Sequence, residues 1–270
     1  MATSAEPTLL GPGDLSGPVE VVGRISDSSN LAVLARLVER DGAHVIYKPV
    51  HGERPLWDFP EGTLAGREVA AYLVSALGGW DLVPPTVLRD GPLGTGSVQL
   101  WVGDPFDPVA DDRVVDLVPG RRVPTGWVGV LDGETAAGER VRLVHQRLPD
   151  VRSLAVLDAA LNNSDRKGSH CLRDDEGRLW AIDHGVCFSP TPKLRTVLWG
   201  WAGEPLAEED RTRLARLARR LARPATRAEL GRLLPAGDVE ALEARVRRLL
   251  ARGRLPEPAP GWPTVPWPPL

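Results

Sequence analysis

Residues 161–185 read LNNSDRKGSHCLRDDEGRLWAIDHG, and the two aspartates Asp165 and Asp183 decide how this stretch is interpreted. Between them, residues 174–177 have the sequence Asp-Asp-Glu-Gly. Short polar side chains followed by a glycine suit a tight turn between two extended arms. The stretch therefore predicts a β-hairpin whose open end brings the two carboxylates together.

The turn also predicts a strand register. If residues 174–177 make a four-residue connection, Arg178 lies opposite Arg173. In the same register His170 lies opposite Ala181, further along the two arms. We therefore expect the loop before the first arm to lie beside the end of the second arm.

A pair of carboxylates fits a glycoside hydrolase, a divalent metal site or a surface ion-pair network. The flanking residues favour phosphoryl transfer. Protein kinases have a catalytic aspartate, a metal-binding asparagine five positions later, and a second metal-binding aspartate followed by an aromatic residue and a glycine. Here Asp165, His170 and Asp183 stand at these three positions. Lys167 follows the first aspartate at the place where protein kinases commonly carry a lysine.

The segment resembles the catalytic and metal-binding loops of the phosphatidylinositol 3-/4-kinase family, which read D-R-H-x-x-N, then a short hairpin, then I-D-F-G. Asp165-Arg166 and Ile182-Asp183 match this pattern, and the separation of 18 positions between the aspartates fits it without a gap. The whole chain also resembles a small bacterial family described as similar to these kinases. The resemblance implies an α+β fold of the two-lobed protein-kinase-like type, with an antiparallel sheet and a helix in the N-terminal lobe and a mainly helical C-terminal lobe.

Three residues depart from that pattern. His170 replaces the metal-binding asparagine, His184 replaces the aromatic residue, and Lys167 replaces the family's histidine. A neutral imidazole ligates Mn²⁺ and similar ions, whereas Mg²⁺ prefers oxygen ligands. Catalysis that is slow, metal-selective or absent is therefore left open.

A kinase-like fold requires a lysine on a strand and a glutamate on a helix in the N-terminal part of the chain. Residues 44–48, HVIYK, alternate like a strand and end in Lys48, one of only three lysines among 33 basic residues. Residues 63–77 have helical periodicity, with Glu68 at the border of the apolar face of Val69, Tyr72, Leu73 and Ala76. We expect Glu68 to pair with Lys48, with Asp58 and Glu61 as weaker alternatives.

The rest of the expected nucleotide site is assigned by position. Ser28 and Ser29 lie in a loop at residues 26–30, between two expected strands, where they would cover the phosphates. Residues 83–88 and 97–102 read as further strands. Trp101 and Val102 end the second of these strands and would form the hinge that meets the adenine edge.

The resemblance implies ATP and Mg²⁺ or Mn²⁺ as cofactors, and an unidentified lipid, protein or small molecule with a hydroxyl group as acceptor. It assigns roles to six residues: Lys48 and Glu68 to the nucleotide phosphates, Asp165 to the acceptor hydroxyl, Lys167 to the moving phosphoryl group, and Asp183 and His170 to the metal. Two alternatives remain. One is a pseudokinase that binds nucleotide without turnover, and the other is an enzyme that binds ATP in reverse and transfers AMP.

The expected organisation is an N-terminal lobe at 1–103, a C-terminal lobe at 104–255 and a Pro- and Trp-containing tail at 256–270. An insert between residues 104 and 149 contains extended pieces at 127–131 and 141–145 around Asp132-Gly133-Glu134, and it reads as a hairpin that could cover the cleft. Helices are expected at 151–162, 207–221, 227–234 and 239–251. The tail is either pinned by Trp262 or Trp267 or forms a flexible arm.

Composition fits a globular enzyme. The 270 residues are 42% hydrophobic, which is enough for a substantial core. A net charge of -3 gives no electrostatic reason to expect a nucleic-acid partner. Cys171 and Cys187 are too few for a disulfide framework and are expected to be buried thiols. The sequence contains neither an apolar run long enough to span a membrane nor a signal-peptide pattern, so we expect a cytoplasmic protein; any protein partner is unknown.

Overall fold

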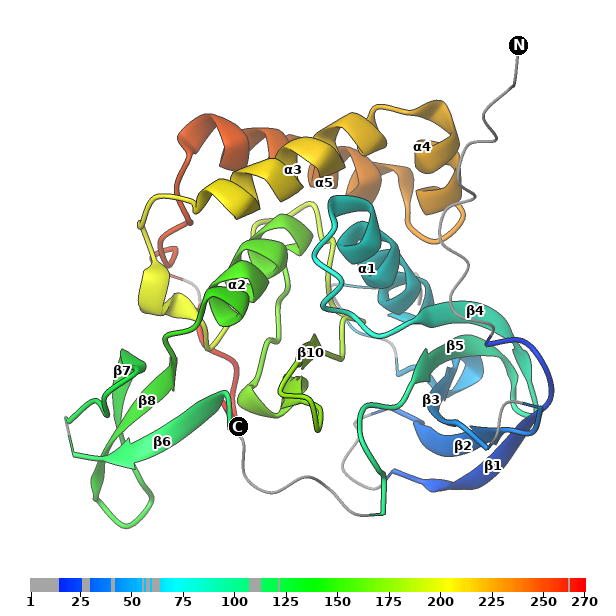
Figure 1. Cartoon of the computed structure of the whole chain (residues 1–270), viewed down its shortest axis with the longest axis horizontal. Helices are drawn as coiled ribbons and strands as arrows, with labels where there is room; N and C mark the ends of the chain where they lie inside the picture. The colour runs from blue at the N-terminus through cyan, green and yellow to red at the C-terminus, as the bar shows by residue number, and fades with distance from the viewer. Residues whose placement is uncertain are drawn as a thin grey trace.

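The computed structural model describes residues 15–25, 30–39, 42–54, 56, 59, 64–106, 113–120, 122–261 and 263–270. Five residues discussed above lie outside these ranges: Ser28, Ser29, Asp58, Glu61 and Trp262. Within the described ranges the chain combines antiparallel sheets with five α-helices, which confirms the α+β class (Figure 1). The two-lobed kinase-like arrangement stays a prediction.

The first sheet contains five strands in the order β1-β2-β3-β5-β4, and every neighbouring pair is antiparallel. Its strands are β1 (Val19–Arg24), β2 (Val33–Leu37), β3 (His44–Pro49), β4 (Thr86–Gly91) and β5 (Gly94–Leu100). Side chains alternate between the two faces of a strand. In β3, Val45 and Tyr47 therefore enter a small core with Val98, while Lys48 points to the opposite face.

Helix α1 (Leu64–Gly78) lies between this sheet and the helical part of the molecule. The predicted apolar face accounts for only part of its burial. Ala70, Ala71, Val74 and Leu77 are buried as well, because α1 contacts β4 and β5 on one side and α3 on another. A helix covered from several sides loses the single apolar face that a surface helix shows.

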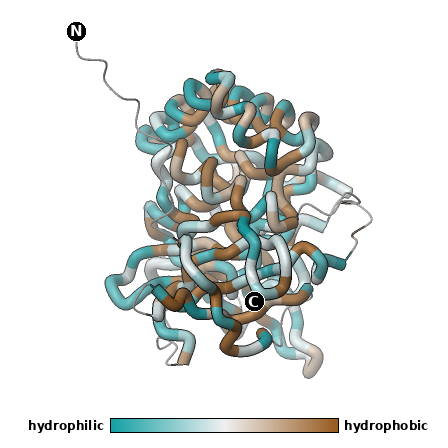
Figure 2. Tube along the Cα trace, turned by 90° about the vertical axis from the view of Figure 1, so that its right-hand side faces the viewer, coloured by the Kyte–Doolittle hydropathy of each residue, from teal (hydrophilic) through white to brown (hydrophobic). Residues whose placement is uncertain are grey.

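Four more helices build the main core: α2 (Pro149–Leu161), α3 (Glu208–Leu221), α4 (Pro224–Leu230) and α5 (Ala236–Arg252). The coiled segments in the upper part of Figure 2 alternate between hydrophilic and hydrophobic colours, as expected for helices that bury one side in a core. The helix predicted at 227–234 begins earlier and ends earlier than expected. Pro224 occupies its first turn, where proline's fixed φ and missing N–H are tolerated.

The insert forms a second antiparallel sheet in the order β6-β8-β7. Its strands are β6 (Val115–Pro119), β7 (Trp127–Glu134) and β8 (Arg140–Gln146). The predicted hairpin is present, but its turn lies at residues 135–139, and β6 was not predicted. His145 anchors β8 because its Nε2 accepts a hydrogen bond from Gly200 N (3.1 Å) and its ring packs on Trp201.

The hairpin between Asp165 and Asp183 lies between the two sheets (Figure 1). It consists of β9 (Cys171–Arg173) and β10 (Leu179–Ala181), and its predicted register was wrong by one residue: Arg173 lies opposite Leu179. The reason is that Asp174 pairs with Arg178, so the loop has three residues and not four, and Gly177 ends it with a left-handed φ of 75°. Such a residue after a type I turn makes a three-residue loop, here between Asp174 and Arg178, whose backbones are hydrogen-bonded.

Three short 3-10 helices complete the described structure: η1 (Val50–Gly52), η2 (Gly168–His170) and η3 (Trp199–Trp201). Both cysteines are buried free thiols, as predicted. No helix in the described ranges is both long and apolar enough to cross a membrane.

Candidate functional site

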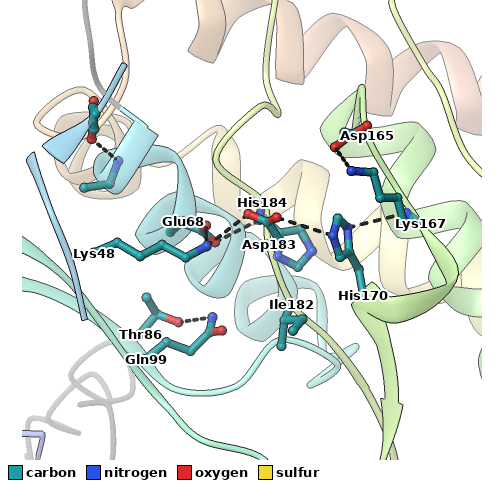
Figure 3. A network of polar contacts seen from close by, with 12 residues as sticks. Lys48, Glu68, Thr86, Gln99, Asp165, Lys167, His170, Ile182, Asp183 and His184 are labelled. Atoms are coloured by element: carbon teal, nitrogen blue, oxygen red, sulfur yellow. Dashed lines mark hydrogen bonds and ion pairs between the residues drawn. The ribbon is translucent and has the colours of Figure 1, made fainter. Parts of the chain in front are cut away.

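Lys48 joins three separate parts of the chain at one point (Figure 3). Its Nζ lies 2.6 Å from Glu68 Oε1 on α1 and 3.0 Å from Asp183 Oδ1 in the loop after β10. The Lys48–Glu68 contact is the one that the sequence predicts. The other carboxylate oxygen of Glu68 accepts a hydrogen bond from the backbone N–H of His184 (2.8 Å), so α1 also holds the loop.

The charges in this cluster stabilise one another. Burial alone would lower the pKa of Lys48, but the negative charges of Asp183 and Glu68 outweigh it and raise that pKa above its usual value. The Lys48 ammonium holds the pKa of Asp183 well below its usual range. Burial raises the pKa of Glu68, and Lys48 acts in the opposite direction. The lysine is therefore positive and Asp183 negative near neutral pH.

Asp183 differs from Glu68 in its exposure and in its backbone conformation. The Asp183 side chain is 47% exposed, whereas that of Glu68 is buried. Asp183 also has a φ of 59°, a left-handed conformation that few residues other than glycine adopt. Such strain is maintained only where the surrounding contacts fix it, and it is common at binding sites. The carboxylate is thus in contact with solvent, while its neighbours fix the backbone that carries it.

Asp165 and Lys167 lie on the loop that follows α2. Lys167 Nζ is 3.3 Å from Asp165 Oδ2, and the backbone N–H of Asp165 donates to Asn163 Oδ1 (3.0 Å). Burial raises the pKa of Asp165, Lys167 opposes this effect, and the negative charge of Asp183 adds to it. The two aspartates are therefore close enough to influence each other's protonation, as the hairpin prediction requires.

His170 lies between these two parts of the network. Its Nε2 is 3.4 Å from Asp183 Oδ2, and its Nδ1 faces the backbone N–H of Lys167 at 3.4 Å. Burial lowers the pKa of His170 to about 4, so the ring is neutral near pH 7. With Nδ1 accepting, Nε2 carries the ring proton and points it at Asp183.

The fit of this pair to a divalent ion follows from its donor atoms. One carboxylate and one imidazole suit an ion that accepts nitrogen, such as Mn²⁺, better than Mg²⁺. Ligation through Nε2 requires the ring proton to move to Nδ1. Among the described residues no three His, Cys, Asp or Glu side chains gather in a way that would hold an ion by themselves. Asp183 and His170 therefore fit an ion whose remaining ligands come from nucleotide phosphates, and their metal role stays a prediction.

A second ionic cluster lies beneath the first. Arg166 and Asp158 are fully buried, and Arg166 Nη2 is 2.9 Å from Asp158 Oδ1. The guanidinium also donates to the carbonyl oxygens of Ile182 (2.7 Å) and His170 (3.3 Å), and it contacts His184 Nε2 at 2.7 Å. Its Nε also donates to Asp158 Oδ2 (3.0 Å), so all five N–H donors of the guanidinium are used. Arg166 thus ties together the loops that carry Asp165 and Asp183.

The predicted hinge residues lie beside the network and not in it. Trp101 and Val102 line a cavity of about 610 Å³, together with the start of β6, Gly168, β9 and Leu270. Its walls are mainly apolar and include the charged residues Asp104, Arg113 and Arg173, and its size lies in the range of small-molecule sites. It lies between the hinge segment and the loop that carries Lys167 and His170.

Another cavity, of about 660 Å³, lies between the starts of α2 and α3. Several of its charged residues pair with one another, as in the contact of Arg213 with Asp210 (3.1 Å) and that of Arg152 with Glu204 (3.4 Å). None of the six residues with predicted chemical roles lines either cavity. We place the candidate site at Lys48 and Asp183 because their contacts bring the predicted residues together.

Sequence reasoning missed the supporting residues Asp158 and Arg195. Asp158 interrupts the apolar run of α2 between Leu157 and Leu161, which is the signal that could have indicated a buried partner. Arg195 lies beside Asp165 and helps to keep its carboxylate charged by lowering its pKa. Asn162 ends α2 in a left-handed conformation, as a capping role predicts.

The chain was also compared with known proteins. It is 44% identical to Protein Rv2133c of Mycobacterium tuberculosis over 269 residues, which cover 97% of this chain and 95% of the relative. A scan against descriptions of known protein families finds no match. Identity at this level over nearly the full length of both chains shows common descent, and the chain belongs to the same family as Protein Rv2133c.

Proposed function

We propose that the protein is an ATP-dependent phosphotransferase of the phosphatidylinositol 3-/4-kinase-like class, which transfers the γ-phosphoryl group to a hydroxyl of a lipid, protein or small-molecule acceptor. The proposal includes a two-lobed arrangement, with the β1–β5 sheet and α1 in the nucleotide-binding lobe up to residue 103. Its main support is the meeting of Lys48, Glu68 and Asp183, which come from a strand, a helix and a loop. These elements are the ones that a kinase uses around its phosphates.

The nucleotide would lie with its base in the 610 Å³ cavity beside Trp101 and Val102. Its phosphates would approach Lys48, which Glu68 already orients. Asp183 and His170 would hold a divalent ion, which neutralises negative charge on the phosphates when bound. Ser28 and Ser29 would cover the phosphates.

Asp165 would orient the acceptor hydroxyl and accept its proton. The hydroxyl oxygen would bond to the γ-phosphorus, and the bond from that phosphorus to the β,γ-bridging oxygen would break, which releases ADP. A pKa raised by burial makes Asp165 a better proton acceptor than an exposed aspartate. Lys167, 3.3 Å from Asp165, would neutralise charge on the moving phosphoryl group. Because the transition state of phosphoryl transfer is loose, positioning and charge neutralisation are expected to supply most of the rate enhancement.

One observation favours a second candidate, a protein that binds nucleotide without turnover. Both carboxylate oxygens of Asp183 already face donors, Lys48 Nζ on one side and His170 Nε2 on the other. An aspartate satisfied in this way has less to gain from a metal ion. Transfer of AMP from reversed ATP is a third possibility that the same experiment separates.

The deciding experiment measures ATP consumption by the purified protein with Mg²⁺ and with Mn²⁺, using ATP labelled at the α or the γ phosphate. Phosphatidylinositol vesicles, a generic protein substrate and small alcohols serve as acceptors. We expect transfer of the γ label, and loss of it by at least about 100-fold in Asp165→Ala and Asp183→Asn. Asp175→Asn, in the exposed turn of the hairpin, is the matched control and should keep full activity.

Three results would contradict the proposal. An active Asp183→Asn protein would exclude the assigned metal and phosphate chemistry. Transfer of the α label would identify an AMP transferase. Tight ATP binding with no turnover on any acceptor class, in the presence of either ion, would favour the non-catalytic protein.

A further inference from the structure

The segment 263–270 contacts the loop that carries Lys167 and also residues Thr196 and Trp199. It contains prolines at positions 263, 266, 268 and 269. Proline fixes φ, so such a segment loses little conformational entropy when it docks. Pro266 is buried, whereas the Trp267 side chain is 83% exposed. Backbone contacts and small apolar side chains therefore hold this segment, and the predicted anchor Trp267 does not.

One end of the segment contacts the chain beside Asp165. The carbonyl oxygen of Thr264 accepts hydrogen bonds from Thr196 N (3.0 Å) and Trp199 Nε1 (2.8 Å). Thr196 in turn lies beside Arg166 in a parallel bridge. The segment is therefore hydrogen-bonded to Thr196, which pairs with Arg166, the residue after Asp165.

The other end contacts the loop between Asp165 and β9. Gly168 N donates to the carbonyl oxygen of Pro269 at 2.8 Å. Within this loop the hydrogen bonds of Lys167 and His170 to each other are longer, at 3.3 and 3.4 Å. Hydrogen bonds weaken with distance, so the hydrogen bond to Pro269 is the stronger one. Position 168 has no room for a side chain, because a Cβ there would lie 2.7 Å from Leu270 Cδ2 and 3.1 Å from Val115 Cβ.

We propose that residues 264–270 are a positioning segment of the candidate site. Pro269 and Leu270 hold the loop at Gly168 in the conformation that places Lys167 beside Asp165 and His170 beside Asp183. Leu270 also lines the cavity that contains Trp101 and Val102, so the same residue bounds the space assigned to the base. This inference rests on the proposed function for its effect on turnover, and on the contacts alone for its effect on the loop.

The test compares the full chain with four variants: deletion of residues 264–270, Leu270→Ala, Gly168→Ala, and the double variant Gly168→Ala with Leu270→Ala. Trp267→Ala is the matched control, since it alters an exposed side chain of the same segment. Amide hydrogen exchange of residues 165–173 and 194–199 reports on the loop, and ATP affinity, KM and kcat report on the site. Thermal unfolding shows whether each variant is folded.

We expect the deletion to increase exchange at Gly168 at least 10-fold without a change in α2 or α5, and to lower kcat by about 10- to 100-fold through misplacement of Asp165 and Lys167. Leu270→Ala should raise KM for ATP more than it lowers kcat. The double variant should bind ATP better than Gly168→Ala alone, because removal of the leucine side chain relieves the contact with the added Cβ. Trp267→Ala should match the full chain in every measurement.

Unchanged exchange at Gly168 in the deletion and in Leu270→Ala would overturn the inference. So would increased exchange with unchanged kcat, KM and affinity in an active enzyme. If the full chain neither binds nor turns over ATP, the proposed function fails. Exchange at Gly168 still decides in that case whether the segment holds the loop.

Discussion

Two ionic clusters contact the loop that carries Asp183, and they differ in burial. Lys48, Glu68 and Asp183 form the first, in which the Asp183 side chain is half exposed. Arg166 and Asp158 form the second, which is closed to solvent. Both pair a basic side chain with a carboxylate. Burial decides their use, because an open carboxylate can exchange its partner for a ligand, whereas a buried pair is expensive to break.

The largest effect is expected from Asp158→Asn in the closed cluster. Loss of this carboxylate leaves the Arg166 guanidinium buried without its counter-charge, which should lower the free energy of unfolding by about 3–5 kcal/mol. Urea unfolding followed by tryptophan fluorescence measures this change. A variant as stable as the original chain would show that the cluster is not structural.

His145 extends the comparison to a buried titratable group whose contacts described above, Gly200 and Trp201, include no carboxylate. His145 is neutral because burial lowers its pKa to about 4, from an ordinary value near 6.5. The unfolded chain therefore binds a proton more readily, so this contribution to stability is complete above pH 6.5 and is lost as the pH falls towards 4. At about 1.4 kcal/mol per pH unit, the loss reaches roughly 3 kcal/mol. Urea unfolding between pH 7 and pH 4 measures it by comparison with His145→Gln, which should lose this part of the pH dependence and keep the part that comes from His170 and His184, whose pKa values burial also lowers.

Asp183→Asn is the matched substitution in the open cluster. Lys48 keeps Glu68 as a partner, and the Asp183 side chain is already in contact with solvent. We expect the free energy of unfolding to change by less than about 1 kcal/mol. The same urea experiment checks this, and a loss as large as that of Asp158→Asn would remove the distinction between the two clusters.

The smallest effect is expected from Asp132→Asn on the surface of the insert. Asp132 accepts two hydrogen bonds from Arg142, at 2.6 and 3.0 Å. Judged by its hydrogen-bond distances alone, this pair would stabilise the fold as much as the pair of Arg166 and Asp158. Because the pair is exposed, we expect a change near the error of the unfolding measurement. A large change would mean that geometry outweighs burial in this protein.

The elements that the sequence predicts best are those with a strong local pattern. The helices α1, α2, α3 and α5 begin and end within three residues of their expected bounds, because apolar periodicity and capping signals are local. The hairpin was also expected, but its register depended on whether Asp174 belongs to the turn or pairs with Arg178. Strand β6 was missed because its five residues, VDLVP, carry little signal without their partner β8.

The candidate site also has residues that the sequence predicts and supporting residues that it does not predict. The kinase-like order of Lys48, Glu68, Asp165, Lys167 and Asp183 is visible in the sequence, and the structure brings these residues into one polar network. Asp158 and the segment 264–270 were not predicted as parts of its support. Their contacts join positions that are far apart in the chain, so no local pattern indicates them.

The sequence by itself determined the α+β class, the turn between the two aspartates and the types of side chain available for chemistry. Each of these depends on neighbouring residues or on residue identity. Only the tertiary structure decided which charges are buried and which are open, and that the chain's last described residues lie against Gly168. The physical reason is that desolvation and long-range hydrogen bonding arise from segments packed together in space, whatever their distance along the chain.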